Sequence, residues 1–314
     1  MNILYIDPIV HSKTSQVYKY YDGLYAALDK YHNCVLHTGN IEDINDVLSK
    51  TDGPIDVIVF GLGWIGFKNE IKNLADTEIV KVGFVFKPQN NLSEKMQFFK
   101  RNKFNLLLTS LPDKNKYNRL SGVKCNRLCY AANPNLFKHT GAKKKYELGF
   151  SGALHQNKIY IDGAFKYKDV RMSIQNNFLS RSDVKCFLNG SDSVAPRIVN
   201  YSEYAKKINE SDMWMATPSP FGDVTPRYFE VAMSGTLLLC SEVHDEYRDI
   251  FRDGENCIEF KEDGSDFTDK FEYYRKHKDE MKQICLNAAK EFAEKHTWDN
   301  RAIEMEEMII NLRK

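Results

Sequence analysis

Short apolar runs alternate with longer amphipathic stretches along most of this 314-residue chain. The run NILYI at 2–6 precedes a stretch at 15–31 whose apolar residues recur every three or four positions, which is typical of a helix. The run DVIVF at 56–60 is rich in β-branched residues and is bounded by glycines. Continuous apolar strands are expected where helices cover both faces of a parallel sheet. The alternation therefore predicts an α/β fold.

The same pattern starts twice along the chain. The predicted strands of the first half are 2–6, 34–37, 56–60, 80–86, 105–109 and 127–130, with helices at 15–31, 41–50 and 92–102. The predicted strands of the second half are 148–151, 184–188, 213–216, 236–240 and 257–260, with helices in part of 158–177 and at 201–210, 227–233, 245–252, 266–277, 279–296 and 298–312. The stretch 131–145 has little apolar periodicity and contains Asn133-Pro134-Asn135, as expected of a linker. We therefore expect two domains, 1–138 and 139–296, and a C-terminal helix at 297–314.

The charge balance limits the classes of partner. Lys and Arg number 44 against 43 Asp and Glu, so the chain has no bulk charge for binding nucleic acid or an anionic membrane, although a local basic patch stays possible. No apolar run approaches the length of a membrane span. The N-terminus resembles a strand rather than a signal peptide. The odd number of cysteines, seven, scattered along the chain, fits reduced thiols, so a cytoplasmic protein is expected.

A glycine-rich loop follows the third predicted strand. Gly61-Leu62-Gly63-Trp64-Ile65-Gly66 matches G-x-G-x-x-G, which binds a pyrophosphate in dinucleotide-binding proteins. In those proteins the motif follows the first strand, and an acidic residue ends a strand about twenty residues later; neither holds here. Three interpretations stay open: a nicotinamide or flavin site, a cleft-facing loop containing Gly61 and Gly63, or a tight turn.

Two polar residues lie just after the first predicted strand, Asp7 and His11. Open α/β sheets bind ligands at the carboxyl ends of their strands. Histidine can act as a general base near neutral pH, and Asp7 could orient it or act as the base itself. The alternative is that Asp7 caps a turn and His11 is solvated.

The segment 218–235 contains the strongest candidate site. Thr225 suits the N-cap of a helix and Pro226 its first position. Arg227 in the first turn opposes the helix dipole, so it is a candidate to bind a phosphate that the helix N-terminus also attracts. Glu230 lies on the same face, and its carboxylate could accept hydrogen bonds from the two hydroxyl groups of a ribose. The alternative is a surface Arg–Glu pair.

The stretch 201–301 resembles the glycosyltransferases of the GT-B fold. The likeness is closest to the group 1-like branch that includes spore-maturation glycosyltransferase-like proteins. It is carried by a match to R-x-F-E-x-x-x-x-G from Arg227 to Gly235, and by 251–256, 273–278, His296-Thr297-Trp298 and Arg301. The resemblance implies two Rossmann-like α/β/α domains facing a cleft, with the C-terminal helix crossing back to the first domain.

The resemblance also implies a nucleoside-diphosphate sugar, such as a UDP- or GDP-sugar, as donor. In the family the helix with the Glu binds ribose or the donor sugar, and basic residues hold the diphosphate. A second basic residue is expected after the first strand of the second domain, where Lys158 is the candidate and Gly152 would let the phosphate approach. Lys158 could instead be an ordinary solvated lysine. Many relatives carry E-x7-E, but Gly222 stands where the first Glu is expected.

The resemblance therefore implies a glycosyltransferase of the hexosyltransferase-like kind, acting on a glycan or another hydroxyl acceptor. No DxD metal motif is evident, so we expect no metal and no cofactor, because positive charge and helix dipoles can stabilise the departing diphosphate. Retention of configuration is expected by analogy with the family. One alternative is a non-catalytic nucleotide-sugar or carbohydrate-binding protein of the same architecture. Another is an NAD-dependent oxidoreductase using Gly61–Gly66.

Overall fold

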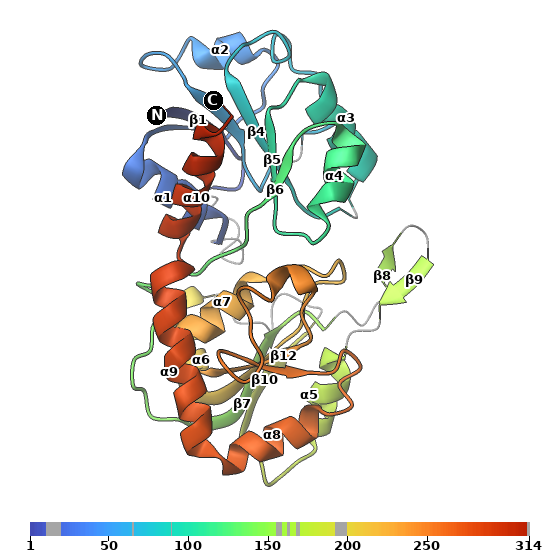
Figure 1. Ribbon diagram of the computed structural model, residues 1–314, viewed down its shortest axis with the longest axis vertical. Coiled ribbons are helices and arrows are strands. Elements are labelled where there is room, and N and C mark those ends of the chain that lie inside the picture. The colour runs from blue at the N-terminus through green and yellow to red at the C-terminus, as the bar shows by residue number, and fades with distance from the viewer. Residues whose placement is uncertain are drawn as a thin grey trace. The chain divides into compact units, whose positions relative to one another are not determined.

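The chain folds into two compact units (Figure 1). The structure is a computed structural model that describes residues 1–10, 20–64, 66–88, 90–154, 159–161, 164–167, 170–191 and 200–312. Unit 1 contains Met1–Cys129 and Trp298–Lys314, and unit 2 contains Tyr130–Thr297. The chain therefore passes between the units twice, after Cys129 and after Thr297.

Unit 1 is built on a six-stranded parallel sheet with the order β2-β1-β3-β4-β5-β6. Its strands are β1 Asn2–Ile6, β2 Asn33–His37, β3 Val57–Phe60, β4 Val80–Val85, β5 Leu106–Thr109 and β6 Cys125–Arg127. Its helices are α1 Tyr20–Tyr31, α2 Ile44–Leu48, α3 Leu92–Arg101, α4 Lys114–Ser121 and α10 Trp298–Ile310. Every residue of β3 and β5 is buried, as expected of strands with both faces covered.

The C-terminal helix α10 packs against α1 within unit 1. The indole of Trp298 lies so close to Gly23 that a Cβ on Gly23 would overlap it. Next to this contact, Lys30 Nζ donates to Asp299 Oδ2 at 2.5 Å. Gly23 therefore lets the two helices approach closely.

Unit 2 is built on a five-stranded parallel sheet with the order β10-β7-β11-β12-β13. Its strands are β7 Tyr146–Gly152, β10 Cys186–Gly190, β11 Ser211–Ala216, β12 Leu237–Ser241 and β13 Ile258–Phe260, and β8 Ile159–Ile161 pairs with β9 Ala164–Tyr167 in a separate antiparallel pair. Its helices are α5 Arg171–Leu179, α6 Tyr201–Asn209, α7 Pro226–Met233, α8 Phe267–Lys276 and α9 Lys278–Lys295, with a 3₁₀ turn η2 at Asp245–Tyr247. Phe178 of α5 and Phe271 of α8 meet over this sheet, with ring centroids 4.8 Å apart.

The predicted α/β architecture is confirmed, and all eleven strand predictions overlap strands of the two parallel sheets, although the last of unit 1 shares only Arg127 with its strand. That strand is placed earlier, as β6, because Leu128–Tyr130 already lead out of unit 1. The predicted helix at 245–252 is wrong beyond its first turn, since only η2 forms. The predicted helix at 41–50 is shorter because Asp43 is its N-cap and accepts from Asn45 N at 2.9 Å. Helix α1 begins at Tyr20, and residues 11–19 lie outside the described part.

Two elements differ from the sequence prediction for physical reasons. The segment 158–177, predicted to be helical in part, is helical from Arg171, and the strands β8 and β9 precede α5. Asp162-Gly163 between the apolar runs is a hairpin signal that could have indicated this pair. Helix α4 was not predicted because its sequence lacks an apolar stripe. Its caps carried the signal: the Asp113 carboxylate accepts from Lys116 N, and Gly122 ends the helix at φ +69°.

The carboxyl ends of β1 and β3 are joined through one buried carboxylate. Asp7 is fully buried, its Oδ2 accepts from Gly63 N at 2.8 Å, and its Oδ1 accepts from Ile9 N at 2.9 Å. A Cβ on Gly61 or on Gly63 would overlap the Asp7 carboxylate. The two glycines of the G-x-G sequence thus leave room for this side chain, which accounts for them without a bound pyrophosphate.

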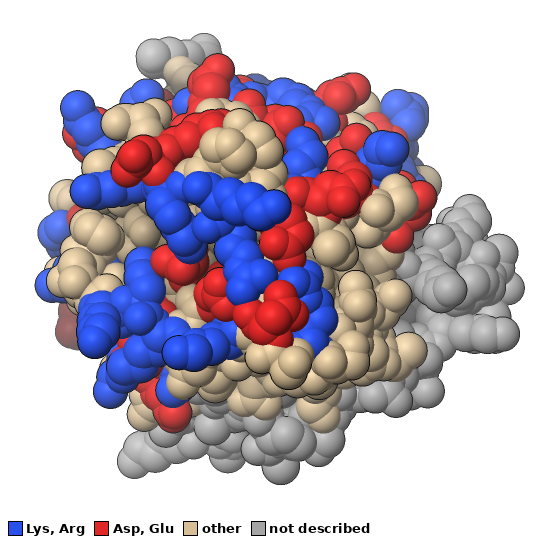
Figure 2. Space-filling model, turned by 90° about the horizontal axis from the view of Figure 1, so that it is seen from below, with Lys and Arg blue, Asp and Glu red and all other residues tan. Residues whose placement is uncertain are grey.

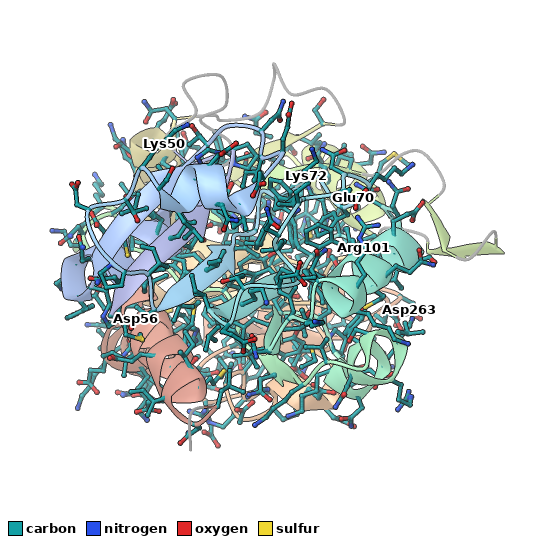
Figure 3. The ribbon with its side chains drawn as sticks, turned by 90° about the horizontal axis from the view of Figure 1, so that it is seen from above. Lys50, Asp56, Glu70, Lys72, Arg101 and Asp263 are labelled. Atoms are coloured by element: carbon teal, nitrogen blue, oxygen red, sulfur yellow. The ribbon has the colours of Figure 1, made fainter. Side chains whose placement is uncertain are left out.

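The segment after this loop is anchored on α3. Arg101, labelled in Figure 3, lies at the end of α3 and donates to the carbonyl oxygen of Asn69 at 2.7 Å. Phe67 packs edge-on against Phe98 with ring centroids 5.7 Å apart. These contacts hold the backbone that leaves the glycine-rich loop.

Charges of both signs cover the surface. On the face in Figure 2, Lys and Arg side chains lie among Asp and Glu side chains. Positive charge on this face is therefore accompanied by negative charge, which weakens its long-range field. No helix among the described residues is both long enough and apolar enough to cross a membrane.

We predict that Gly63→Ala lowers the free energy of unfolding of unit 1 by about 1–3 kcal/mol, because the new methyl group displaces Asp7. Urea unfolding measures this, with Trp64 and Trp298 as fluorescent probes of unit 1 in a Trp214→Phe background. Gly39→Ala is the matched control: its Cβ would lie 3.4 Å from the nearest atom, His37 Nε2, an ordinary contact. The control should change stability by less than about 0.5 kcal/mol. Equal stability of the two variants would contradict the packing role of Gly63.

Candidate functional site

The candidate site lies where the strand order of unit 2 reverses. Strand β7 has β10 on one side and β11 on the other, so the chain runs from β7 to β10 at one edge and then crosses to β11 on the opposite side of β7. Ligands of open α/β sheets bind outside the carboxyl ends of the strands at such a point. The loop after β7 begins at Ala153, and the loop after β11 runs from Thr217 to the start of α7.

Helix α7 begins in this loop with an uncapped N-terminus. Thr225 is the N-cap, as predicted, with extended backbone at φ −84° and ψ 164°, but its side chain makes no capping hydrogen bond. Its Oγ1 is buried and has no hydrogen-bond partner among the described residues. Pro226 occupies the first turn. The first-turn N–H groups of α7 are therefore left without a side-chain cap, which suits an anion.

Arg227 lies against the end of β7. Its Cζ is 5.5 Å from the centroid of the Phe150 ring. A Cβ on Gly152 would lie 2.5 Å from Arg227 Nη2, so glycine allows the guanidinium to approach the backbone. The Nε of Arg227 is buried and lacks a hydrogen-bond partner within the described part of the chain. A half-buried cation with an unused donor, held beside a helix N-terminus, has the chemistry to bind phosphate.

Glu230 is a buried carboxyl group rather than half of a surface pair. Glu230 is 4% exposed, so it is not part of a surface pair. Burial raises the pKa of Glu230 to about 7, although the charge of Arg227 and a hydrogen bond with Tyr204 act in the opposite direction. Glu230 is therefore partly protonated near neutral pH.

Tyr204 of α6 connects these two residues and was missed by the sequence analysis. Its hydroxyl interacts with both Arg227 and Glu230, and burial raises the pKa of the phenol. The ring packs edge-on against Trp214 of β11, with centroids 5.7 Å apart. An aromatic residue on the inner face of a predicted helix indicates only core packing, so no sequence pattern predicts this polar role.

The other predicted site residues are distributed as follows. His11 and Lys158 lie outside the described residues. Asp7, Gly61 and Gly63 lie together in unit 1, where the buried Asp7 carboxylate has the contacts of a structural residue; its role as a base stays a prediction. Gly152 and Arg227 are in contact in unit 2.

Gly222 occupies the position where the E-x7-E pattern expected from the family resemblance has its first Glu. Its φ is +83°, in the left-handed region that favours glycine. Its N–H donates to the carbonyl oxygen of Ser219 at 2.9 Å, which closes a turn before α7. A glutamate at this position would strain the turn, so the backbone itself explains the departure from E-x7-E.

One group of described residues has the composition of a metal site. The ligand atoms of Cys240, Cys257 and Glu259 all lie within 4.8 Å of one another, and all three residues are buried. The other Glu259 oxygen accepts from Arg248 Nη1 at 2.5 Å. Burial raises the pKa of the Cys240 thiol, which disfavours the thiolate that a metal needs. These residues lie outside α7 and the loops after β7 and β11. The prediction that the activity needs no metal stays a prediction.

The segment with the candidate site matches a known family. Residues 176–307, less than half of the chain, match the model of a family described as glycosyl transferase-like. A comparison with curated proteins gives no match.

Several solved structures share the fold of the whole chain. HepE of Anabaena, crystallised in complex with UDP-glucose, is 11% identical, with a TM-score of 0.58 over 99% of this chain and 100% of that chain. A sucrose-phosphate synthase from Thermosynechococcus elongatus is 10% identical, with a TM-score of 0.64 over 99% of each chain. A glycosyltransferase from Rickettsia africae is 11% identical, with a TM-score of 0.61 over 100% of this chain and 98% of that one. The chain has the GT-B fold. At these identities the structures show the fold alone, and the spore-maturation branch stays a prediction.

The raised pKa of Glu230 predicts a pH-dependent stability. Between the usual pKa of 4.5 and about 7 the folded state binds more protons than the unfolded state, so stability falls as pH rises through this range. We expect Glu230→Gln to gain about 2–3 kcal/mol relative to the wild type between pH 5 and pH 8. Urea unfolding at both pH values measures the difference. Glu203→Gln removes an exposed carboxyl from α6 and should follow the wild type; a Glu230→Gln profile parallel to the wild type would refute the buried carboxyl.

Proposed function

We propose that this protein is a glycosyltransferase that moves a sugar from a nucleoside-diphosphate sugar to a hydroxyl group of a glycan or another acceptor. The observation that carries the proposal is Arg227, which lies in the first turn of the uncapped helix α7 and against Gly152. The positive end of a helix dipole and a guanidinium beside it suit a diphosphate. The match of residues 176–307 to a glycosyl transferase-like family and the GT-B fold support the same function.

The donor would be bound by residues of unit 2. We propose that the diphosphate contacts Arg227, Thr225 and the backbone at Gly152, with Lys158 as a further cation. The Glu230 carboxyl group, which also interacts with Tyr204, would accept hydrogen bonds from the ribose hydroxyl groups. HepE was crystallised with UDP-glucose and also with UDP and glucose, so a UDP-sugar is the first donor to test, and a GDP-sugar the second.

The reaction would break the bond between the anomeric carbon and the diphosphate oxygen and form a bond from that carbon to the acceptor oxygen. Arg227 and the dipole of α7 would stabilise the negative charge on the departing diphosphate without a metal ion. The acceptor hydroxyl loses its proton, and His11 is the proposed base, with Asp7 orienting it or acting in its place. Transfer of a hexose with retention of configuration is part of the proposal. The seven unpaired cysteines support a reducing, cytoplasmic location.

A second candidate is a binding protein of the same architecture that has no activity. The backbone at Gly222 favours it, because the turn there has no carboxylate for the donor sugar. Release of free sugar or transfer to an acceptor from a bound UDP- or GDP-sugar would identify the enzyme, and tight binding without turnover would identify the binding protein.

We predict that UDP or GDP binds in the absence of divalent metal, because Arg227 and α7 supply the positive charge. A thermal-shift screen of nucleotides and nucleotide-sugars in EDTA measures this. A ligand at 100 times its Kd should stabilise the protein by about 2.7 kcal/mol. The same screen with Mg²⁺ or Mn²⁺ is the control, and binding that occurs only with a metal would contradict the proposal.

We predict that Arg227→Ala lowers kcat/KM by about 10²–10³, the scale for removing one electrostatic donor to a developing anion. Arg227→Lys should restore only part of it, because a point charge replaces the bidentate fork. Without ligand, Arg227→Ala should cost little stability, since a cation at a helix N-terminus is unfavourable. Steady-state kinetics and apo melting temperatures test both effects. Near-normal turnover of Arg227→Ala, or loss of its fold in the absence of ligand, would show that Arg227 has a structural role instead.

A further inference from the structure

One buried arginine joins the two loops of the candidate site. Arg171, the first residue of α5, is 3% exposed. Its Nε donates to Thr217 Oγ1 at 2.7 Å, and its Nη1 donates to the carbonyl oxygen of Ala153 at 2.9 Å. Its Nη2 donates to the carbonyl oxygens of Thr217 at 3.2 Å and Pro218 at 3.3 Å. A single guanidinium thus connects the loop after β7 with the loop after β11.

These are the two loops at the point where the strand order reverses. Ala153 directly follows Gly152, whose backbone lies against the guanidinium of Arg227. Thr217 and Pro218 begin the loop that leads into α7. The contacts of Arg171 therefore fix the backbone on both sides of the space that the Arg227 guanidinium and the α7 N-terminus border.

The same face of α5 holds a third strand end. Gln175, one turn after Arg171, accepts from Gly190 N at 2.9 Å and donates to the Gly190 carbonyl oxygen at 3.3 Å. Gly190 is the last residue of β10. Burying a charged and an amide side chain is costly unless their polar atoms are hydrogen-bonded, and apolar residues would fill the same volume without that cost. Their placement at the carboxyl ends of three strands points to a positional role.

We propose that Arg171 is a positioning residue for the diphosphate of the donor. It keeps the Gly152–Ala153 and Thr217–Pro218 backbones at the separation that lets Arg227 and the first-turn N–H groups of α7 reach one anion. Arg171 acts through these groups and does not contact the nucleotide. The inference rests on the proposed function, because it assumes that a nucleoside diphosphate binds at α7.

The chemistry of arginine suits this role better than that of lysine. The guanidinium is planar and presents its N–H donors in a rigid fork, so one side chain can meet acceptors on two loops in fixed directions. A lysine ammonium on a flexible stem can reach some of these oxygens but does not fix their relative positions. Arg171→Lys therefore separates the geometry of the group from its charge.

The first experiment compares a diphosphate with its nucleoside. Titration calorimetry uses whichever of UDP and GDP binds the wild type, together with uridine or guanosine. We expect Arg171→Met to weaken binding of the diphosphate about 10–100-fold, which is the scale for losing one charge-assisted contact between Arg227 and the diphosphate. The affinity for the nucleoside should stay within about twofold of the wild type. Arg171→Lys should lie between Arg171→Met and the wild type. Equal losses for diphosphate and nucleoside would overturn the proposal, as would a diphosphate affinity unchanged in Arg171→Met.

The second experiment tests whether Arg171 acts through Arg227. In an Arg227→Ala background, Arg171→Met should weaken diphosphate binding clearly less than in the wild-type background, because one of the two groups that Arg171 positions, the Arg227 guanidinium, is already absent. A loss as large as in the wild-type background would show an independent effect and overturn the proposed mechanism.

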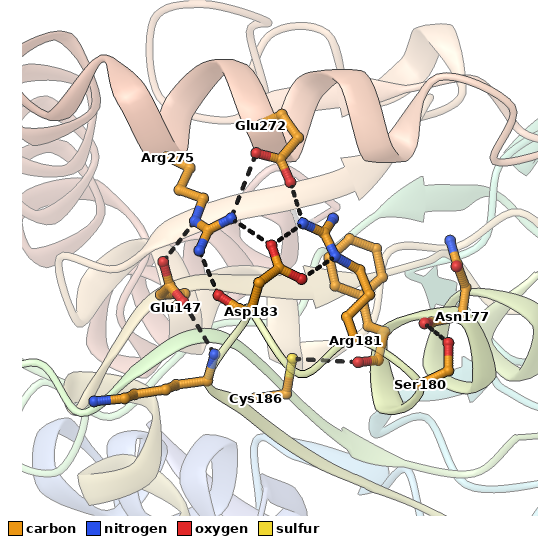
Figure 4. A network of polar contacts seen from close by, with 10 residues as sticks. Glu147, Asn177, Ser180, Arg181, Asp183, Cys186, Glu272 and Arg275 are labelled. Atoms are coloured by element: carbon orange, nitrogen blue, oxygen red, sulfur yellow. Dashed lines mark hydrogen bonds and ion pairs between the residues drawn. The ribbon is translucent and has the colours of Figure 1, made fainter.

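A matched control lies at the opposite end of the same sheet. Arg275 of α8 donates to Glu147 Oε1 at 2.7 Å and to Asp183 Oδ2 at 3.0 Å, so it also joins a residue of β7 to the segment next to β10 (Figure 4). Arg275→Met should lower the melting temperature and leave diphosphate affinity within about twofold, since its contacts are at the amino ends of the strands. A loss of affinity in this control equal to that in Arg171→Met would mean that general destabilisation explains both.

A milder variant covers the case in which Arg171→Met does not fold. Thr217→Val removes only the hydroxyl acceptor of Arg171 Nε. It should weaken diphosphate binding about 3–10-fold, the loss of one hydrogen bond, and wild-type affinity in this variant would overturn the proposal. A wild-type protein that binds neither UDP nor GDP contradicts the proposed function itself. A wild type that binds one of them while all Arg171 and Thr217 variants bind equally well contradicts only the role of Arg171.

Discussion

The candidate site depends on a cation held where a helix disfavours it. Arg227 lies in the first turn of α7, at the positive end of the helix dipole. The ring of Phe150 on one side and the Tyr204 hydroxyl nearby hold the guanidinium in place, and Gly152 gives it room. An anion that binds there gains from both positive charges at once. This electrostatic arrangement is the reason to look for a diphosphate at α7.

The sheets of the two units follow the same strand order, but different side chains lie at the point where that order reverses. In unit 1 the Asp7 carboxylate fills the space between the ends of β1 and β3 and accepts backbone N–H groups on both sides. In unit 2 the corresponding loops are held by Arg171, and the N-cap hydroxyl of Thr225 and the Nε of Arg227 lack partners among the described residues. The reversal point of unit 1 is closed by an anion of the chain. That of unit 2 presents donors suited to an anion from outside.

Local signals predicted most of the framework. The apolar runs gave the strands of both sheets because a doubly buried strand needs apolar residues on both faces. Thr225 and Pro226 located the start of α7 because capping and the fixed φ of proline act within one turn. The strands β8 and β9 were not predicted, because the segment 158–177 carries both a helical pattern and an Asp-Gly hairpin signal, and these two local signals compete. It also missed α4, whose caps are strong and whose apolar face is small.

By itself, the sequence determined the two α/β units, the start of α7, and Arg227 and Glu230 as residues to examine. Only the tertiary structure decided how these residues are used. The hydrogen bonds of Arg171 to Thr217 join positions 46 residues apart, and that of Asp7 to Gly63 joins positions 56 apart. No local pattern records which distant carbonyl or carboxylate a side chain will meet. Burial decided the rest: Glu230, whose spacing alone allowed a surface pair with Arg227, lies inside unit 2 beside Tyr204 because α6 packs over it, and its ionisation follows from that packing.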